Sequence, residues 1–521
     1  MAENGARELA LAKLANFEVE ATSLVAYQSS GRVIAVGPDD ALELCAQLPD
    51  SINLTRLSTG ATASPPQIDG YLGNFTIATG DDTTPQHRCD AVLDLHDTPL
   101  LSSEMLPPGY FHVAPSDFDT SGIDEALAAI SGEFRKPKYF DYDPSICAHG
   151  VNGKTVCRRC IDACPADAIA SIGERIEVVP QLCQGGGTCS TVCPSGAIRY
   201  VYPSLRDNGA RLRAMLSTWH ENSETRPIVM FHAEGDDPAN YRDSFETLLP
   251  FAVEELGSVG MDLCLSALAS GAAQVVLLAG ESVPKRTLAA IDAEVAWARE
   301  LLTGIGFDAA CIAICAAQAG FDTVAAPIEI EFSPIDVPGA KRDALYRAID
   351  HLVAQGAPAS DRIAFESEAP FGEAIVDAGK CTLCMACVGA CPGKALQDGT
   401  NREVPELFFV ESNCLQCGAC VQTCPEDAIT LQRRYLFDPE ARNRSRDLNR
   451  DQPFACIACG KPFAPTSVIH KMQEKLKGHY MFGNARALDR LKMCDDCRVV
   501  DIVQDPEAMG GQFDPLKGFK Q

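Results

Sequence analysis

Alternating apolar and polar segments predict a parallel α/β domain in the middle of the chain, over residues 225–325. Apolar runs typical of buried strands lie at Ile228–His232, Gln274–Leu278 and Cys311–Cys315. Helical patterns separate them at Met261–Ser270 and Arg286–Leu302. The second pattern has a stripe at helical spacing, formed by Leu288, Ile291, Val295 and Leu302. Strands that alternate with helices indicate a parallel sheet with right-handed crossovers.

Residues 1–140 show a similar but weaker alternation. Strand-like runs at Leu24–Gln28 and Arg32–Val36 precede a helical stretch that begins at Asp39 or Asp40. The pattern predicts an α/β or α+β domain, without indicating its role. Isolated cysteines are commonly small buried hydrophobes, so we expect Cys45 and Cys89 to be core residues rather than ligands. The same expectation applies to Cys264, Cys311 and Cys315 in the central domain.

Cysteines dominate the segment 371–437, in two runs with the same spacing. The runs are Cys381-x2-Cys384-x2-Cys387-x3-Cys391-Pro392 and Cys414-x2-Cys417-x2-Cys420-x3-Cys424-Pro425. This is the spacing of bacterial two-cluster ferredoxins, in which the cysteine before proline binds the neighbouring cluster. It predicts one 4Fe-4S cluster on Cys381, Cys384, Cys387 and Cys424, and another on Cys414, Cys417, Cys420 and Cys391. Zinc is an improbable alternative for tandem runs of this kind.

A related segment, 141–204, departs from that spacing twice. Its runs are Cys147-x9-Cys157-x2-Cys160-x3-Cys164-Pro165 and Cys183-x5-Cys189-x3-Cys193-Pro194, with Gly186 where a normal run has its middle cysteine. The crossing rule predicts a third 4Fe-4S cluster on Cys147, Cys157, Cys160 and Cys193. It leaves Cys164, Cys183 and Cys189 for a fourth centre. That centre is either a 3Fe-4S cluster or a 4Fe-4S cluster completed by water, hydroxide or another side chain; an empty site is the alternative.

Both segments repeat the order cysteine run, helix start, strand. Strands at Ile176–Val179 and Glu406–Val410 lead into the second cysteine runs. Small-apolar pairs follow each Cys-Pro at one offset and are expected to begin short helices; they are Ala168-Ile169, Ala197-Ile198, Ala395-Leu396 and Ala428-Ile429. We therefore predict an α+β multidomain protein with two ferredoxin-like βαββαβ modules flanking the parallel α/β domain. His149 is expected on a surface loop, with ligand or proton carrier as the alternative roles.

Residues 453–505 contain two further cysteine pairs. Cys456-x2-Cys459 and Cys494-x2-Cys497 have the form of zinc knuckles, and a closed four-cysteine site is typical of structural zinc. We predict a zinc-binding region here, with a fifth iron centre as the alternative.

Composition adds the cellular setting. The chain has 521 residues and 46% hydrophobic content, which predicts roughly three to four soluble domains. Its 24 cysteines mostly stand in metal-ligand spacings, and residues 1–20 have mixed charge without a signal-peptide core, so we expect a cytoplasmic protein. The longest apolar stretch, Leu263–Gly280, is interrupted by polar residues, and no membrane insertion is expected.

Charge bears on the choice of partner. The net charge of −27, from 71 acidic and 44 basic residues, disfavours nucleic acid as a partner. It either steers the protein to a positively charged partner or keeps it soluble. A basic run interrupts the trend and is expected to be a solvated linker, with a docking patch as the alternative; it comprises Arg433, Arg434, Arg442, Arg444, Arg446 and Arg450.

Two sets of residues resemble a known family. The sequence Cys147-Ala148-His149-Gly150 leading to Cys157, and the C-terminal motifs at 456–463 and 493–501, are similar to large ferredoxin-type 4Fe-4S proteins associated with proteobacterial formate dehydrogenases. The central segment resembles the delta subunit of methyl-viologen-reducing hydrogenase, although it lacks an obvious cysteine set for that family's cluster. The resemblance implies formate dehydrogenase as the redox partner.

These observations predict an iron–sulfur subunit that relays electrons between a partner dehydrogenase and an acceptor. No nucleophile–base constellation, phosphate loop or nucleotide fingerprint is recognisable, so no catalytic site of its own is expected. The alternative is a non-catalytic maturation or assembly factor for a molybdenum-dependent dehydrogenase. A metal-sensing nucleic-acid protein is disfavoured by the acidity.

Overall fold

The computed structural model describes residues 2–60, 65–79, 87–118, 120–239, 241, 245–316, 330–399, 404–479, 482 and 484–505. The chain forms two compact units. The first comprises Met1–His149 with Cys157–Ser360, and the second comprises Gly150–Val156 with Asp361–Gln521.

The first unit begins with a domain built on a four-stranded parallel sheet. Its strand order is β3 (Asn53–Ser58), β2 (Arg32–Gly37), β7 (Ala91–Asp94) and β8 (Tyr110–His112). One face packs against α2 (Asp39–Glu43), η1 (Leu44–Gln47) and α3 (Thr120–Ala128), in a core that includes Cys45. The other face packs against the antiparallel strands β4 (Gln67–Asp69), β5 (Phe75–Ala78) and β6 (His87–Cys89). Cys45 and Cys89 are thus buried core residues, as expected.

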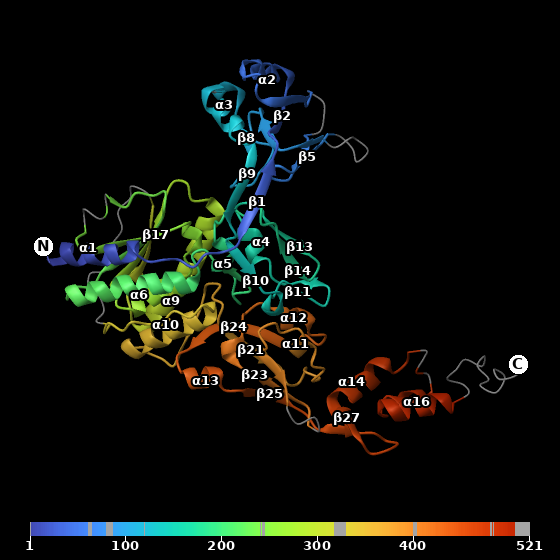
Figure 1. The fold of residues 1–521 in the computed structure, drawn as a ribbon. Coiled ribbons are helices and arrows are strands. Elements are labelled where there is room, and N and C mark those ends of the chain that lie inside the picture. Colours follow the sequence, from blue (N-terminus) through green and yellow to red (C-terminus); the bar gives the residue numbers. More distant parts are fainter. Residues whose placement is uncertain are drawn as a thin grey trace, which may run out of the picture. The chain divides into compact units, whose positions relative to one another are not determined.

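Two elements connect this domain to the rest of the first unit. The antiparallel strands β1 (Leu24–Ser29) and β9 (Gly132–Pro137) run from it as a two-stranded ribbon (Figure 1). Helix α1 (Ala2–Ala15) lies apart from the N-terminal sheets and packs against α6 (Leu205–Asn222), with Ala6 and Ala10 buried. The segment 1–140 is therefore not one packing unit.

The segment 141–204 follows the order strand, helix, strand, strand, helix, strand. The elements are β10 (Phe140–Tyr142), α4 (Arg159–Ala163), β13 (Ile169–Ile172), β14 (Arg175–Val178), α5 (Thr188–Thr191) and β15 (Ile198–Tyr200). Antiparallel pairing joins β10 to β15 and β13 to β14. Between η3 (Pro144–Ile146) and α4, the chain forms a short hairpin, β11 (Gly150–Val151) and β12 (Lys154–Thr155).

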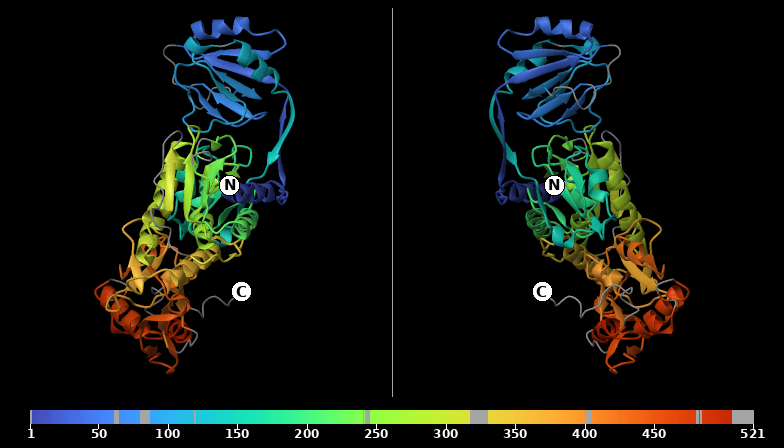
Figure 2. Two further views of the ribbon diagram at one scale, coloured as in Figure 1. Left: turned by 90° about the vertical axis from the view of Figure 1, so that its left-hand side faces the viewer. Right: turned by 90° about the vertical axis from the view of Figure 1, so that its right-hand side faces the viewer.

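The central domain contains a four-stranded sheet that is parallel throughout. Its order is β17 (Leu248–Val253), β16 (Ile228–Ala233), β18 (Gln274–Ala279) and β19 (Ile312–Ala316). Helices α6, α8 (Met261–Ala269), α9 (Lys285–Ile305) and α10 (Lys341–Gln355) pack in this part of the unit, as both views in Figure 2 show. Helix α9 also contacts α4 and α5, so the domain supports the neighbouring cysteine loops.

Most predicted elements of this domain lie close to their expected positions. On α9, Ile291, Val295 and Leu302 are buried, whereas Leu288 is only partly buried. The three cysteines Cys264, Cys311 and Cys315 are buried, as expected. Strand β17 and helix α10 were not predicted. The predicted end of the domain, at residue 325, lies outside the described residues.

The second unit repeats the strand and helix order around its cysteine runs. The elements are β21 (Gly372–Val376), α11 (Ala386–Gly389), β22 (Leu396–Asp398), β23 (Glu406–Phe409), α12 (Ala419–Thr423) and β24 (Ile429–Leu436). Strand β21 pairs with β24, and β22 pairs with β23. Two outer strands extend these pairs, β20 (Arg362–Ala364) on β24 and β25 (Arg446–Arg450) on β23.

The C-terminal part of the second unit is small. It has an antiparallel pair, β26 (Pro453–Ala455) and β27 (Pro462–Pro465), followed by α14 (Thr466–Leu476), α15 (Ala485–Arg490) and α16 (Asp495–Val503). Among the described residues, no helix combines the length and apolar character that crossing a membrane requires.

One local prediction is wrong in all four repeats. The small-apolar pairs after Cys-Pro begin strands β13, β15, β22 and β24 instead of helices. The helices lie before Cys-Pro, because a residue that precedes proline is disfavoured in helical geometry. Three residues after each of these cysteines the backbone turns left-handed, at Asp167, Gly196, Lys394 and Asp427, and the chain reverses into the strand.

The expectation of a solvated basic linker is also wrong. Residues 433–450 form β24, α13 (Pro439–Asn443) and β25, and Arg434 and Arg442 are buried. The Arg434 guanidinium donates two hydrogen bonds to the Glu411 carboxylate, and Arg446 pairs with Glu373. These arginines hold the sheets of the second unit together, because burial of their partners' carboxylates requires a cation.

Candidate iron–sulfur and metal sites

Four cavities bring the cysteines together, and each cavity draws on two runs. In the first unit, one cavity is lined by Cys147, Cys157, Cys160 and Cys193, and the other by Cys164, Cys183 and Cys189. In the second unit, one is lined by Cys381, Cys384, Cys387 and Cys424, and the other by Cys391, Cys414, Cys417 and Cys420. In every case the cysteine before proline has crossed to the cavity of the other run, which is the grouping that the sequence predicts.

Three of the cysteine loops share one backbone pattern. The second and fourth residues after the first cysteine have positive φ: Leu383 and Met385, Gln416 and Gly418, Gly185 and Gly187. Backbone that alternates in this way makes a concave nest of N–H groups suited to an anionic group such as a thiolate-bound cluster. Gly186 therefore occupies the same place in its loop as Cys384 and Cys417 occupy in theirs.

The turns after Cys-Pro supply hydrogen bonds to sulfur. The backbone N–H of Ala168 points to the Cys164 Sγ at 3.4 Å, that of Ala395 to the Cys391 Sγ at 3.2 Å, and that of Ala428 to the Cys424 Sγ at 3.4 Å. Such bonds favour the thiolate and help to set a cluster's potential. In the remaining turn, Ser195 takes this place: its Oγ lies 3.6 Å from the Cys193 Sγ.

Burial and mutual proximity disfavour charge on the free thiols. Burial, and then the charges of Cys193, Cys157 and Cys147, raise the pKa of Cys160 to about 12. The same two causes raise the pKa of Cys387 to about 12, with Cys381, Cys384 and Cys424 as its neighbours. Ligating sulfur must be thiolate, so a bound cation has to offset this cost. Iron–sulfur clusters are held by soft thiolate ligands, which these all-sulfur sets supply, and the residues present therefore fit the group.

The cavity with three cysteines has an additional lining residue, Met105, from the loop between β7 and β8. The cavity is also bordered by residues of its own loops, Gln184, Gly186, Gly187 and Thr188. From β9, Lys136 Nζ donates to the carbonyl of Cys183 at 2.6 Å and to that of Gln181 at 3.0 Å. No motif in the sequence points to Met105 or Lys136, because both lie outside the cysteine runs.

His149 is not on the surface, so that expectation is wrong. It is 1% exposed, and its ring nitrogens lie 2.7 Å from the Cys157 carbonyl and 2.8 Å from the Ser171 hydroxyl. The histidine joins the loop of Cys157 to β13, because a buried imidazole needs partners at both nitrogens. This is a positioning role at the wall of the Cys147 cavity.

The C-terminal cysteines form a compact group of their own. The sulfur atoms of Cys456, Cys459, Cys494 and Cys497 all lie within 4.8 Å of one another. The Cys494 N–H points to the Cys456 Sγ at 3.3 Å, and Cys494 is the N-cap of α16. Arg490 pairs with Asp501 and Asp505, which fixes α16 against α15. A set of four sulfur donors suits a tetrahedral structural metal such as zinc.

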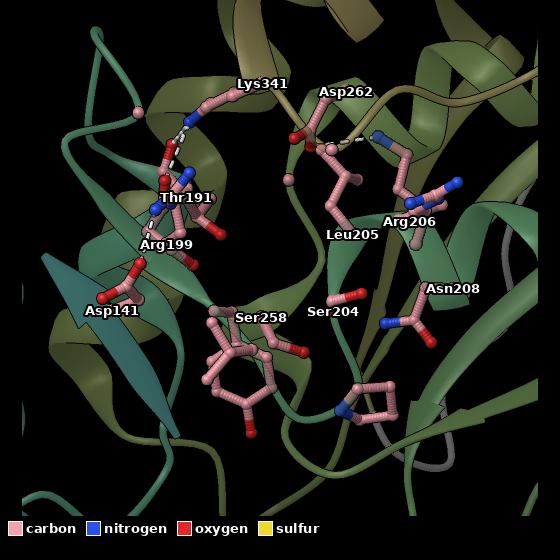
Figure 3. A pocket seen from close by; sticks show the side chains of 18 of the residues that line it. Asp141, Thr191, Arg199, Ser204, Leu205, Arg206, Asn208, Ser258, Asp262 and Lys341 are labelled. Carbon is pink, nitrogen blue, oxygen red and sulfur yellow. Dashed lines mark hydrogen bonds and ion pairs between the residues drawn. The ribbon is translucent and has the colours of Figure 1, made fainter. Parts of the chain in front are cut away.

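A larger pocket of about 320 Å³ lies between the first cysteine module and the central domain. Figure 3 shows Lys341 of α10 pointing at Thr191; its Nζ also donates to the carbonyl of Ser190 at 3.0 Å. Arg199 and Asp141 pair across neighbouring strands on the same side of the pocket as Thr191, and Ser204 and Asn208 lie on the opposite side. Ile198 lines both this pocket and the cavity of Cys147, so the two are neighbours. No pattern along the chain predicts this pocket, because its walls come from distant segments.

Comparison with known proteins identifies a family match in the second unit. Residues 380–429 match the family described as "4Fe-4S dicluster domain". No curated protein matches the chain. The match covers both cysteine runs of the second unit, so the prediction of a ferredoxin-type 4Fe-4S domain there is confirmed. Together with the cysteine groups, it indicates an iron–sulfur electron-transfer role, and a 4Fe-4S dicluster domain is present in this chain.

Proposed function

We propose that this chain is an iron–sulfur electron-transfer subunit that relays electrons between a partner dehydrogenase, formate dehydrogenase, and an acceptor. The observation that carries the proposal is the set of four cysteine-lined cavities, two in each unit, each combining sulfurs from two runs. The dicluster match covers one of these pairs. The choice of formate dehydrogenase rests on the resemblance of the motifs around Cys147 and Cys456.

The proposed metal content follows from the donor sets. The three cavities with four cysteines would each hold a 4Fe-4S cluster. The cavity of Cys164, Cys183 and Cys189 would hold a 3Fe-4S cluster or a 4Fe-4S cluster with three thiolates. The group of Cys456, Cys459, Cys494 and Cys497 would hold zinc. In this arrangement both βαββαβ modules are ferredoxin-like, and the polypeptide spaces and insulates the clusters.

Reduction by formate tests the relay directly. Anaerobically purified protein is mixed with the candidate formate dehydrogenase and formate, and bleaching of the cluster absorption is followed by rapid mixing. We expect bleaching at the rate of formate turnover, with paramagnetic signals of reduced clusters. The same mixture without formate is the control. Clusters that stay oxidised while the dehydrogenase turns over would favour a maturation or assembly factor, in which the clusters only support binding surfaces.

The three-thiolate centre has a separate test in Gly186→Cys. A Cβ at residue 186 would meet Met105 Sδ and Pro165 Cγ at 3.5 Å each, which is ordinary contact, and the φ of Gly186 is not positive. The substitution should therefore fold and convert the unusual centre towards a four-thiolate cluster. Paramagnetic resonance spectra that are the same before and after the change would contradict the three-thiolate assignment.

A further inference from the structure

We propose that the Met105 thioether is the fourth ligand of the centre held by Cys164, Cys183 and Cys189. This inference rests on the proposed function, since it concerns a cluster in that cavity. It identifies the side chain that completes the coordination where Gly186 replaces a cysteine.

The place of the missing ligand is defined by the neighbouring loops. Gly186 stands between Gly185 and Gly187 as Cys384 stands between Leu383 and Met385, with the same alternation of φ. The Cα–Cβ bond of a side chain at residue 186 would therefore point towards the cavity that Cys164, Cys183 and Cys189 line. Met105 Sδ lies 3.5 Å from the position of that Cβ, so sulfur is already present at the corner where the cysteine is missing.

The segment around Met105 is held in place on three sides. The Met105 N–H donates to the Pro165 carbonyl at 2.9 Å, directly after Cys164. The Gln184 amide donates to the Leu106 carbonyl at 2.8 Å, directly after Cys183. Glu104 accepts from the N–H of Arg286 at 3.0 Å, and the Arg286 guanidinium in turn donates to the Cys164 carbonyl at 2.8 Å. These bonds fix residues 104–106 to both cysteine loops of the cavity. A residue that only filled space would not need its backbone to be fixed in this way.

Thioether chemistry suits this corner. Methionine sulfur is soft and polarisable, like the thiolates beside it, and it is uncharged. A centre with three thiolates and one thioether carries one negative charge less than its all-cysteine neighbours, and a lower negative charge favours the reduced cluster. The centre would thus be electronically distinct while keeping four irons.

Met105→Leu is the decisive variant, because leucine preserves size and apolar character but has no sulfur. Wild-type protein should keep this centre as a 4Fe-4S cluster after mild ferricyanide treatment. In Met105→Leu, ferricyanide takes one electron from the open cluster, ferrous iron leaves, and a 3Fe-4S cluster remains. The expected result is one iron atom fewer per chain and a new three-iron resonance signal in the oxidised protein.

Two comparisons make the test specific. Met472→Leu is the control for the exchange of methionine by leucine: Met472 lies on α14 and is 37% exposed, so its loss should leave iron content and spectra unchanged. In the Gly186→Cys background, a thiolate supplies the fourth ligand, so Met105→Leu should have no effect on the iron count.

The outcomes separate this inference from the proposed function. If Met105→Leu retains the iron content and resonance spectra of the wild type, or if the wild type itself shows the three-iron signal, the thioether is not a ligand. If the loss of iron is the same with and without Gly186→Cys, the effect is one of packing, and the inference is wrong. Protein that holds no iron in any cavity would overturn the proposed function itself.

Discussion

Individual side chains in this protein mainly serve to hold cysteine loops at fixed positions. The three-residue offset from Cys-Pro to a left-handed turn directs a backbone N–H to the sulfur in three of the four repeats. Just before Cys414, the carboxylate of Glu411 is buried and accepts two hydrogen bonds from Arg434, at 2.9 and 2.7 Å. Glu373 on β21 accepts from Arg434 and Arg446, which extends the network across the sheet.

At this scale we predict that Arg434→Leu strongly destabilises the second unit. The substitution removes both hydrogen bonds from the Glu411 carboxylate, whose side chain is 6% exposed, and leaves it the longer 3.6 Å contact to Arg446. Breaking a buried pair in this way costs about 3–5 kcal/mol. The measurement is the urea concentration at which the cluster absorption of the anaerobic protein is half lost.

Arg433→Leu is the neighbouring control. Its partner Glu368 is 74% exposed, and an exposed pair contributes roughly 0–1 kcal/mol. Equal urea midpoints for the two variants would show that the Arg434 network stabilises the second unit no more than the exposed Arg433 pair does.

At the scale of elements, the β1–β9 ribbon gives the N-terminal domain a connection to the three-cysteine cavity. Tyr27 on β1 donates its hydroxyl to the Gln181 carbonyl at 2.7 Å. Lys136, on the neighbouring strand β9, donates to the carbonyls of Gln181 and Cys183, and its Nζ lies 5.1 Å from the centroid of the Tyr27 ring. Together with Met105, these residues connect the N-terminal domain, whose role is unassigned, to the loop of Cys183.

We therefore expect Lys136→Met to make the centre of Cys164, Cys183 and Cys189 labile. Loss of two charge-assisted hydrogen bonds frees the carbonyls of the loop, and such bonds each contribute about 1.5–3 kcal/mol. On exposure to air, the resonance signal of this centre should decay faster than in the wild type, while the signals of the four-cysteine centres keep their rates.

Arg135→Met, on the same strand, is the control, because Arg135 forms an exposed pair with Glu133. Uniform acceleration at every centre would mean that Lys136 acts on general stability rather than on its loop.

At the scale of the whole molecule, metal binding is divided among separate supporting structures. Each of the two units carries a pair of cysteine cavities, and the C-terminal region carries a four-sulfur group of its own. Among the described residues of that region, few apolar side chains are buried; Ile469, Ala487 and Leu491 are examples. A small domain with so little core depends on a staple such as a structural metal.

The corresponding prediction concerns metal removal. If the group of Cys456, Cys459, Cys494 and Cys497 holds zinc as proposed, mild chelation should release it and render residues 453–505 sensitive to protease, while the visible absorption of the iron–sulfur clusters persists. Cys459→Ser should reproduce the protease sensitivity without chelator. The prediction is wrong if the region resists protease after its metal has gone, or if chelation bleaches the clusters at the same rate.

The parts of the site that could be predicted are those whose sequence signals act over a few residues. Cysteine spacing and the Cys-Pro turns act over a few residues, so sequence alone grouped the cysteines that the cavities bring together. The absence of a cysteine at Gly186 was visible in the same way. The burial of Arg434 and His149 was not, because exposure depends on strands and loops that lie elsewhere in the chain.

Sequence by itself determined the cysteine groups, the parallel α/β pattern of residues 225–316 and the place of the missing ligand. Tertiary structure alone decided that α1 packs on α6, that β17 joins the central sheet, and that Met105 and Lys136 reach a cluster loop far along the chain. The physical reason is the same in each case. Backbone periodicity and ligand spacing are local properties of the sequence. Contacts between domains depend instead on apolar faces and hydrogen-bonding groups that are distant in the sequence and meet only in the folded chain.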